Sequence, residues 1–236
     1  MRELITTSEA ELGNFWTKEV YPFVTPIVEA GRSGRPLPIG SGILVSYDGK
    51  EYLLTAYHVT KNACSLDEGG ALYAFTPEQS EIMGVNNYVD DPFDLSMTEL
   101  PPPSRRCLRL PRHLASDIRG GELCLVVGFP ARSKSWQLDH SRHTLRPAPF
   151  SYLGSVFRTL AGRFSVRFSR NHVSPDGRKL PQTGKLNGIS GGGAFVLRDD
   201  RPRLAGIIIE YHSSSAEIVC SDSQVVWSMA RQLQNV

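Results

Sequence analysis

The sequence predicts an all-β fold built from two β-rich halves, with a helix at each end of the chain. Short runs of apolar, β-branched and aromatic residues recur along it, and Gly, Pro, Asp and Asn separate them. This alternation is typical of strands bounded by turns, and its spacing favours a barrel or sandwich over βαβ units. A Pro-rich stretch at 101–112 divides the runs into two groups. We therefore expect a helical extension at 1–22, a first β-rich half at 23–112 and a second at 113–236.

The terminal helices are predicted from capping residues and apolar spacing. Ser8 and Glu11 fit a capping box, and Pro22 would stop the helix that begins there. At the other end, Asp222 or Ser223 can cap a final helix. Its apolar residues form one stripe, made of Val226, Met229, Ala230 and Leu233.

The strands are predicted from the apolar runs themselves. Tyr47-Asp48-Gly49-Lys50 joins two of them and predicts a tight hairpin, because Asp-Gly supplies the positive φ angles of the turn. The runs lie at 23–31, 40–49, 50–59 and 71–77 in the first half, and at 121–130, 151–160, 163–171, 190–200 and 203–212 in the second.

Composition describes an ordinary globular chain and excludes several classes of function. The 236 residues carry 26 basic and 24 acidic side chains, a formal charge of +2, so we expect neither nucleic acid nor a membrane as partner. No apolar run is long enough to span a bilayer, and the first residues do not follow the pattern of a secretory signal. The scattered cysteines indicate reduced thiols in a cytoplasmic protein. They are Cys64, Cys107, Cys124 and Cys220.

Three segments carry residue types that could perform chemistry together. A strand-like run ends at His58, an acid at Asp94 precedes alternating apolar residues, and Ser190 lies in a glycine-rich turn. A serine hydroxyl needs a base to remove its proton, and a neutral imidazole suits that task near pH 7. The imidazole in turn needs a carboxylate on its other nitrogen. Backbone N–H groups of the turn, those of Gly188 and Ser190, can hold a developing oxyanion.

These segments resemble the three signatures of the trypsin-like (chymotrypsin-fold) serine proteases: T-A-x-H, D-L/I-x-x-x-x-L and G-x-S-G-G. They occur here in the family's order, at 55–58, 94–100 and 188–192. The resemblance covers about residues 24 to 236. It implies two β-barrel halves with the site in the cleft between them.

The same resemblance implies a serine endopeptidase acting on a protein or peptide, with no cofactor and no metal. His58, Asp94 and Ser190 would form the catalytic triad. By motif alignment, Gly184 would lie at the base of the primary specificity pocket. Ile209 and Glu210 would lie on the strand whose edge pairs with the substrate, where Glu210 could favour a basic side chain.

The chain departs from the family pattern at the residue before the nucleophile. Ile189 stands where secreted members carry the aspartate that pairs with an N-terminus made by cleavage. Val59 and Leu186 stand where those members carry cysteines. We therefore do not expect activation by cleavage of a zymogen. We expect a partner or ligand to control activity by ordering the loop at 184–189, with the N-terminal helix involved.

The same residues also admit other interpretations. Asp90 and Asp91 compete with Asp94 for the role of the acid, but Asp91-Pro92 is typical of a turn. Residues 188–192 also match the G-x-S-x-G elbow of α/β-hydrolases, although its serine should begin a helix that three glycines would destabilise. The second candidate function is a catalytically idle module of the same fold that binds peptides or serves as a scaffold.

Two charged segments could suggest other partners. Asp139 to His143 contains two histidines that could bind a metal, but an exposed loop is the better interpretation. The basic run from Arg163 to Lys185 could contact an acidic partner or a phosphate. We interpret it as a solvated face, because no aromatic residues alternate with the charges as nucleic-acid binding would require.

Overall fold

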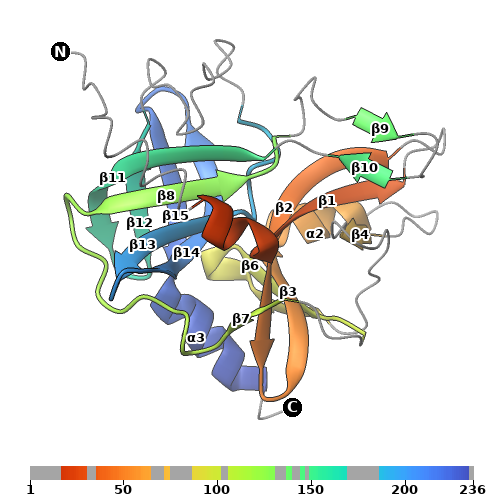
Figure 1. Cartoon of the computed structure of the whole chain (residues 1–236), viewed down its shortest axis with the longest axis horizontal. Coiled ribbons are helices and arrows are strands. Elements are labelled where there is room, and N and C mark those ends of the chain that lie inside the picture. Colours follow the sequence, from red (N-terminus) through yellow and green to blue (C-terminus); the bar gives the residue numbers. More distant parts are fainter. Residues whose placement is uncertain are drawn as a thin grey trace.

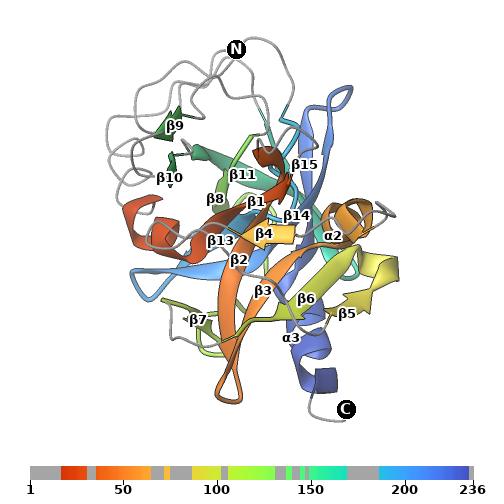
Figure 2. The same ribbon diagram turned by 90° about the vertical axis from the view of Figure 1, so that its right-hand side faces the viewer.

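The computed structural model describes residues 17–30, 36–64, 72–74, 87–101, 106–130, 137–139, 144–146, 149–168 and 186–233. Strands dominate these residues, and they form one sheet in the first half and a closed barrel in the second (Figures 1 and 2). The chain passes from one to the other through the segment 106–115. There Leu110 N donates to Ser46 O of the first half, and Ala115 N donates to Leu204 O of the second.

The first half is a seven-stranded sheet. Six strands follow the order β4-β1-β2-β3-β6-β5, and β7 pairs with β2 in parallel. Part of the predicted linker is therefore a short strand. The bounds are β1 Val24–Ala30, β2 Pro36–Tyr47, β3 Lys50–Ala56, β4 Leu72–Ala74, β5 Asn87–Asp90, β6 Leu95–Glu99 and β7 Leu108–Arg109.

The hairpin between β2 and β3 has the predicted turn. Tyr47 pairs with Lys50, and the two residues between them have positive φ angles, 49° at Asp48 and 77° at Gly49. Two successive residues in this conformation twist the turn to match the twist of the strands that it joins. Beyond the turn, Leu53 pairs with Leu44 and Leu54 with Ile43, and both leucines are buried although they point to opposite faces of the sheet.

The second half closes into a barrel in the order β11-β12-β15-β14-β13-β8. A separate two-stranded sheet, β9 and β10, precedes β11 in the sequence. The bounds are β8 Leu123–Gly128, β9 Gln137–Asp139, β10 Thr144–Arg146, β11 Phe150–Leu160, β12 Arg163–Arg167, β13 Gly193–Arg198, β14 Arg201–His212 and β15 Glu217–Asp222.

Helices are few and short within the described ranges. Residues 17–20 are helical and lead into the 3₁₀ helix η1 (Tyr21–Phe23), whereas the predicted helix up to residue 16 lies outside the described residues. The others are α2 (Tyr57–Cys64), the 3₁₀ helix η2 (Asp91–Phe93) and α3 (Ser223–Gln232). Asp222 caps α3, since its Oδ1 accepts from the N–H groups of Gln224 and Val225. The predicted C-terminal helix and its cap are confirmed.

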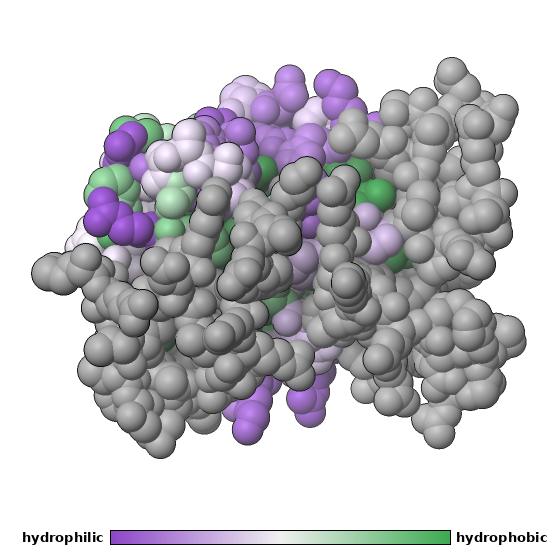
Figure 3. Space-filling view, turned by 90° about the horizontal axis from the view of Figure 1, so that it is seen from above, coloured by the Kyte–Doolittle hydropathy of each residue, from purple (hydrophilic) through white to green (hydrophobic). Residues whose placement is uncertain are grey.

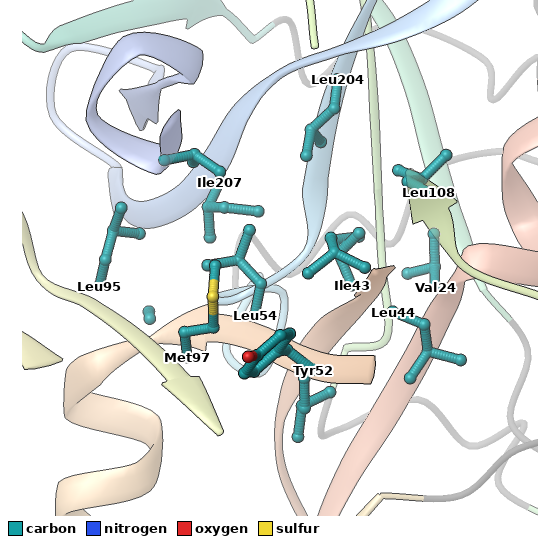
Figure 4. Close-up of a cluster of buried hydrophobic side chains, with 14 of the residues drawn as sticks. Val24, Ile43, Leu44, Tyr52, Leu54, Leu95, Met97, Leu108, Leu204 and Ile207 are labelled. Carbon is teal, nitrogen blue, oxygen red and sulfur yellow. The ribbon is translucent and has the colours of Figure 1, made fainter. Parts of the chain in front are cut away.

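One apolar cluster joins the two halves. Leu204 and Ile207 of β14 point toward Ile43, Leu54 and Met97 of the first sheet (Figure 4). Three of the four residues in the predicted apolar stripe of α3 are fully buried in this cluster. They are Val226, Met229 and Ala230. Each buried side chain of the larger types contributes about 1.5–3 kcal/mol. The cleft between the halves is therefore held by apolar packing that belongs to both.

The described part of the surface is mostly hydrophilic on the face seen from above, with single hydrophobic side chains between (Figure 3). Among the described residues, four large hydrophobic side chains are exposed: Val89, Leu123, Phe157 and Leu160. No helix in this part of the chain is long and apolar enough to cross a membrane.

Candidate active site

His58 and Asp94 form a doubly connected pair at the end of the first sheet. Strand β3 runs into α2, so His58 lies in the first turn of that helix. Its Nδ1 lies 2.7 Å from Asp94 Oδ2, and its backbone N–H donates to Asp94 Oδ1 at 2.9 Å. Both carboxylate oxygens of Asp94 therefore hold the same histidine. Because a carboxylate only accepts, Nδ1 carries the ring proton and Nε2 remains available as a base.

The backbone around Asp94 explains why this acid, rather than Asp90 or Asp91, lies against the histidine. Asp91 begins the 3₁₀ helix η2, and Asp94 ends it in the left-handed conformation with φ of 54°. This reversal turns its side chain toward α2, and Asp94 O accepts from Tyr57 N–H at 2.9 Å. Asp94 is 26% exposed, compared with 43% for His58, so the acid is the better shielded of the two.

Ser190 lies in a tight turn of the second half. Ile189 N–H donates to Leu186 O at 3.2 Å, which closes a turn in which Gly188 has φ of 95°. That angle favours glycine, because a side chain would meet the backbone there. Ile189 is 1% exposed and packs in the barrel interior. The residue before Ser190 is thus anchored by apolar contacts.

Ser41 connects the first half to this turn. Its N–H donates to Ser190 O at 2.8 Å, and its hydroxyl donates to Gly188 O at 2.9 Å. The same hydroxyl accepts from Phe129 N–H at 2.8 Å, and Thr55 Oγ1 donates to Ser41 O at 2.6 Å. Two of these four hydrogen bonds hold the serine turn, and the bond from Thr55 ties Ser41 to the strand that leads to His58.

The pair and the serine line one cavity of about 430 Å³. Ser190 Oγ donates to Ile209 O at 3.4 Å, and the hydrogen bonds of the described residues include none between Ser190 Oγ and His58. The complete lining is His58, Asp94, Arg163, Leu186, Asn187, Ile189, Ser190, Ile209, Glu210 and Tyr211.

The three predicted substrate-binding residues have different positions. Ile209 is buried and, with Glu210, lines the cavity. The Glu210 side chain is 65% exposed, and its Oε2 lies 2.8 Å from His212 Nε2, so a neighbouring group partly satisfies its charge. Gly184 lies outside the described residues.

The alternative chemistries find little support in the described part of the chain. Ser190 is followed by a turn and by β13 rather than by a helix, which excludes the α/β-hydrolase elbow. Cys124 and Cys220 lie in the barrel interior, where burial raises the pKa of both thiols and keeps them protonated. No group of three His, Cys, Asp or Glu residues in the described segments could hold a metal, although residues 140–143 of the suggested loop lie outside them.

Sequence reasoning missed the contributions of Ser41 and Arg163. Gly40-Ser41-Gly42 begins the predicted strand at 40–49, but only the fold shows that its serine reaches the turn at 188–190. Arg163 belongs to the run interpreted as a solvated face. It is instead half-buried and lines the cavity. No local signal separates it from Arg167, which is exposed on the same strand.

No family model matches the sequence, and no curated protein matches it. Among solved structures, the fold is similar to that of a serine endoprotease from Yersinia pestis, with a TM-score of 0.63 and 14% sequence identity. The match covers 94% of this chain and 66% of that one. At this identity the similarity concerns the fold, which is the all-β fold of the chymotrypsin-like proteins. The predicted fold class is confirmed.

Proposed function

We propose that this chain is a serine endopeptidase that cleaves peptide bonds through an acyl-enzyme on Ser190. One observation carries the proposal: the His58–Asp94 pair of the first half and Ser190 of the second line the same cavity. That arrangement supplies a base, a group that orients the base and a nucleophile. The similarity to a solved serine endoprotease supports the same class of reaction.

The mechanism follows from the roles that the geometry allows. Ser190 Oγ attacks the substrate carbonyl while His58 Nε2 takes its proton, and Asp94 stabilises the imidazolium through Nδ1. His58 then protonates the leaving amine, and water releases the acyl group by the reverse sequence. The N–H groups of Gly188 and Ser190 would hold the oxyanion. One such donor typically lowers the barrier by about 3–4 kcal/mol.

The alternative is a peptide-binding or scaffolding module without catalysis. The bond between Ser190 Oγ and Ile209 O favours it, since the hydroxyl does not donate to a base in this state. A rotation about the serine χ1 angle redirects the hydroxyl, and catalytic hydrogen bonds are often long before substrate binds. This bond, which favours the binding module, is therefore also compatible with catalysis, and a labelling experiment distinguishes the two functions.

Labelling with a fluorophosphonate probe tests the proposal. We expect the wild-type protein to form a covalent adduct at Ser190, and we expect neither Ser190→Ala nor His58→Ala to do so. Circular dichroism and thermal melting would verify that the variants fold. A folded wild-type protein that fails to label, yet binds peptides, would favour the binding module or an enzyme that is inactive until its partner or ligand binds.

We also propose that the site becomes active without cleavage of the chain. Ile189 is buried among apolar residues and the turn at 186–189 closes on itself, so the described part of the loop at 184–189 needs no new N-terminal amine. A partner or ligand would then regulate the enzyme through residues 184–189 and the N-terminal helix. Full activity of purified protein both before and after deletion of residues 1–20 would contradict the regulatory part.

A further inference from the structure

Arg163 contributes a positive charge to the wall of the cavity. It is the first residue of β12, and its Nη2 donates to Pro92 O at 2.6 Å. The guanidinium carbon lies 5.9 Å from the centre of the Phe93 ring, so the head group rests on the turn that precedes Asp94. Arg163 is half-buried, and its Nε is fully buried without a hydrogen-bond partner among the described residues.

The acids of the cavity do not neutralise this charge. Asp94 has one oxygen bonded to the backbone of His58 and the other to its ring. Glu210 pairs with His212 and is largely exposed to solvent. Within the described residues no carboxylate forms an ion pair with Arg163.

The Arg163 side chain is only partly buried, and its bond to Pro92 O lies at the exposed surface, so an anion in solution can reach its charge. Its one hydrogen bond, to a backbone carbonyl, could be made by a neutral donor and does not require a charge. The charge is instead suited to an anion that arrives from outside. Because the guanidinium presents several N–H donors in one plane, the matching group is a carboxylate, which can accept two of them.

We propose that Arg163 selects substrates that carry an acidic side chain within a few residues of the scissile bond. This inference rests on the proposed peptidase function, and it names the class of substrate for that same site. It concerns a different residue from Glu210, whose expected selection of a basic side chain stays a prediction.

The first test measures cleavage of a peptide library by the wild-type protein, followed by matched peptides that differ only in Glu against Gln at the selected position. If Arg163 forms a charge-assisted hydrogen bond with the Glu side chain, kcat/KM for the Glu peptide should exceed that for the Gln peptide about 10- to 100-fold. We expect Arg163→Gln to abolish this preference, Arg163→Lys to retain part of it and Arg163→Glu to reverse it toward basic peptides.

Arg167→Gln is the matched control. Arg167 lies four residues along the same strand, about 13 Å away, and its guanidinium stacks 4.1 Å from the centre of the Phe157 ring, outside the cavity. We expect this variant to keep the wild-type preference. Equal cleavage of Glu and Gln peptides by a wild-type protein that labels with fluorophosphonate would overturn the role of Arg163 and leave the peptidase intact.

Binding measurements keep the two proposals separate. Isothermal titration of the same peptides with Ser190→Ala measures recognition without cleavage. If the wild-type protein does not label, tighter binding of the acidic peptide that is lost in Ser190→Ala/Arg163→Gln still supports recognition by Arg163. Equal binding of both peptides would overturn it. Thermal melting identifies a variant that fails to fold, and Arg163→Lys then serves in its place.

Discussion

Gly191 occupies a position between the two halves that leaves no room for a side chain. Its φ is 85°, and a Cβ built there would lie 1.9 Å from Ser41 O and 2.0 Å from Thr55 Oγ1. We expect Gly191→Ala to lower the free energy of unfolding by about 2–5 kcal/mol, because backbone strain and overpacking combine. Urea denaturation would measure the loss, and fluorophosphonate labelling should fall with it.

Gly121 provides the control for backbone strain alone. Its φ is 81°, but a Cβ there would meet nothing within 4 Å. Gly121→Ala should therefore cost only about 1–2 kcal/mol and leave labelling unchanged. Equal losses in the two variants would show that the close approach at Gly191 does not matter.

His113 predicts a dependence of stability on pH. Its Nδ1 accepts from Arg109 N–H at 2.7 Å, which requires a neutral ring on that side. Burial, followed by the charges of Arg203, Arg112 and Arg109, lowers the pKa of His113 in the folded state. The unfolded chain then binds the proton more readily, so this contribution is complete above about pH 6.5 and is lost as the pH falls.

The urea midpoint of the wild-type protein should therefore fall between pH 7.5 and pH 5.5 by more than that of His113→Asn. Asparagine can accept the same hydrogen bond but does not titrate. The comparison isolates His113, because every other histidine is common to both proteins. Parallel pH profiles would mean that His113 titrates alike in the folded and unfolded chains.

At the scale of elements, the turn η2 is held by the opposite half. Ser221 Oγ donates to Phe93 O at 2.5 Å, and the Phe93 ring lies over Gly162, where a Cβ would be 2.3 Å from it. These contacts fix the turn that carries Asp94. Ser221→Ala should cost about 1 kcal/mol of stability. It should also lower kcat about tenfold with little change in KM, because a displaced acid misorients the base.

Ser223→Ala is the comparison for this prediction. Ser223 is also buried and also donates to a backbone carbonyl, Ala115 O at 2.6 Å, but that carbonyl does not belong to η2. We expect a similar loss of stability with kcat unchanged. If both variants lowered kcat equally, the effect would be a general consequence of destabilisation and not of the position of η2.

Elements with local signals were the ones that the sequence could predict. Asp48-Gly49 and Asp222 act through their own backbone and its immediate neighbours, so their turn and cap follow from residue type. The parallel pairing of β7 with β2 joins segments about sixty residues apart, and no local pattern encodes it. The order of the three motifs indicated that His58, Asp94 and Ser190 belong together, but it carried no information on which side chains surround them.

At the scale of the whole molecule, the shared core predicts a single unfolding transition. The apolar cluster includes Met97 of the first sheet and Ile207 of the barrel, and Tyr47 packs edge-on against Trp227 of α3 at 5.5 Å. Calorimetry should give equal calorimetric and van't Hoff enthalpies.

Met97→Ala should lower the free energy of unfolding by about 2–5 kcal/mol. It should lower the free energy of opening for hydrogen exchange at amides in β14 by the same amount.

Hydrogen exchange followed by mass spectrometry would measure those amides. Independent protection of β3 and β14, or a Met97→Ala effect confined to the first sheet, would contradict a single cooperative unit. The sequence predicted two halves from its linker and turns. It could not predict that the two halves share one apolar core, because an apolar run indicates that a strand is buried but not which element packs against it.

The hydrogen bonds of Ser41 limit which substitutions this protein can accept during evolution. One small side chain in the first half satisfies groups on both Gly188 and Phe129, and its main chain bonds to Ser190. A substitution there would disturb folding and the nucleophile together. A saturation library selected only for folding and another selected only for reactivity should therefore reject the same variants at position 41. We therefore expect proteins that evolve from this chain to keep Ser41 and to change instead at residues that line the cavity.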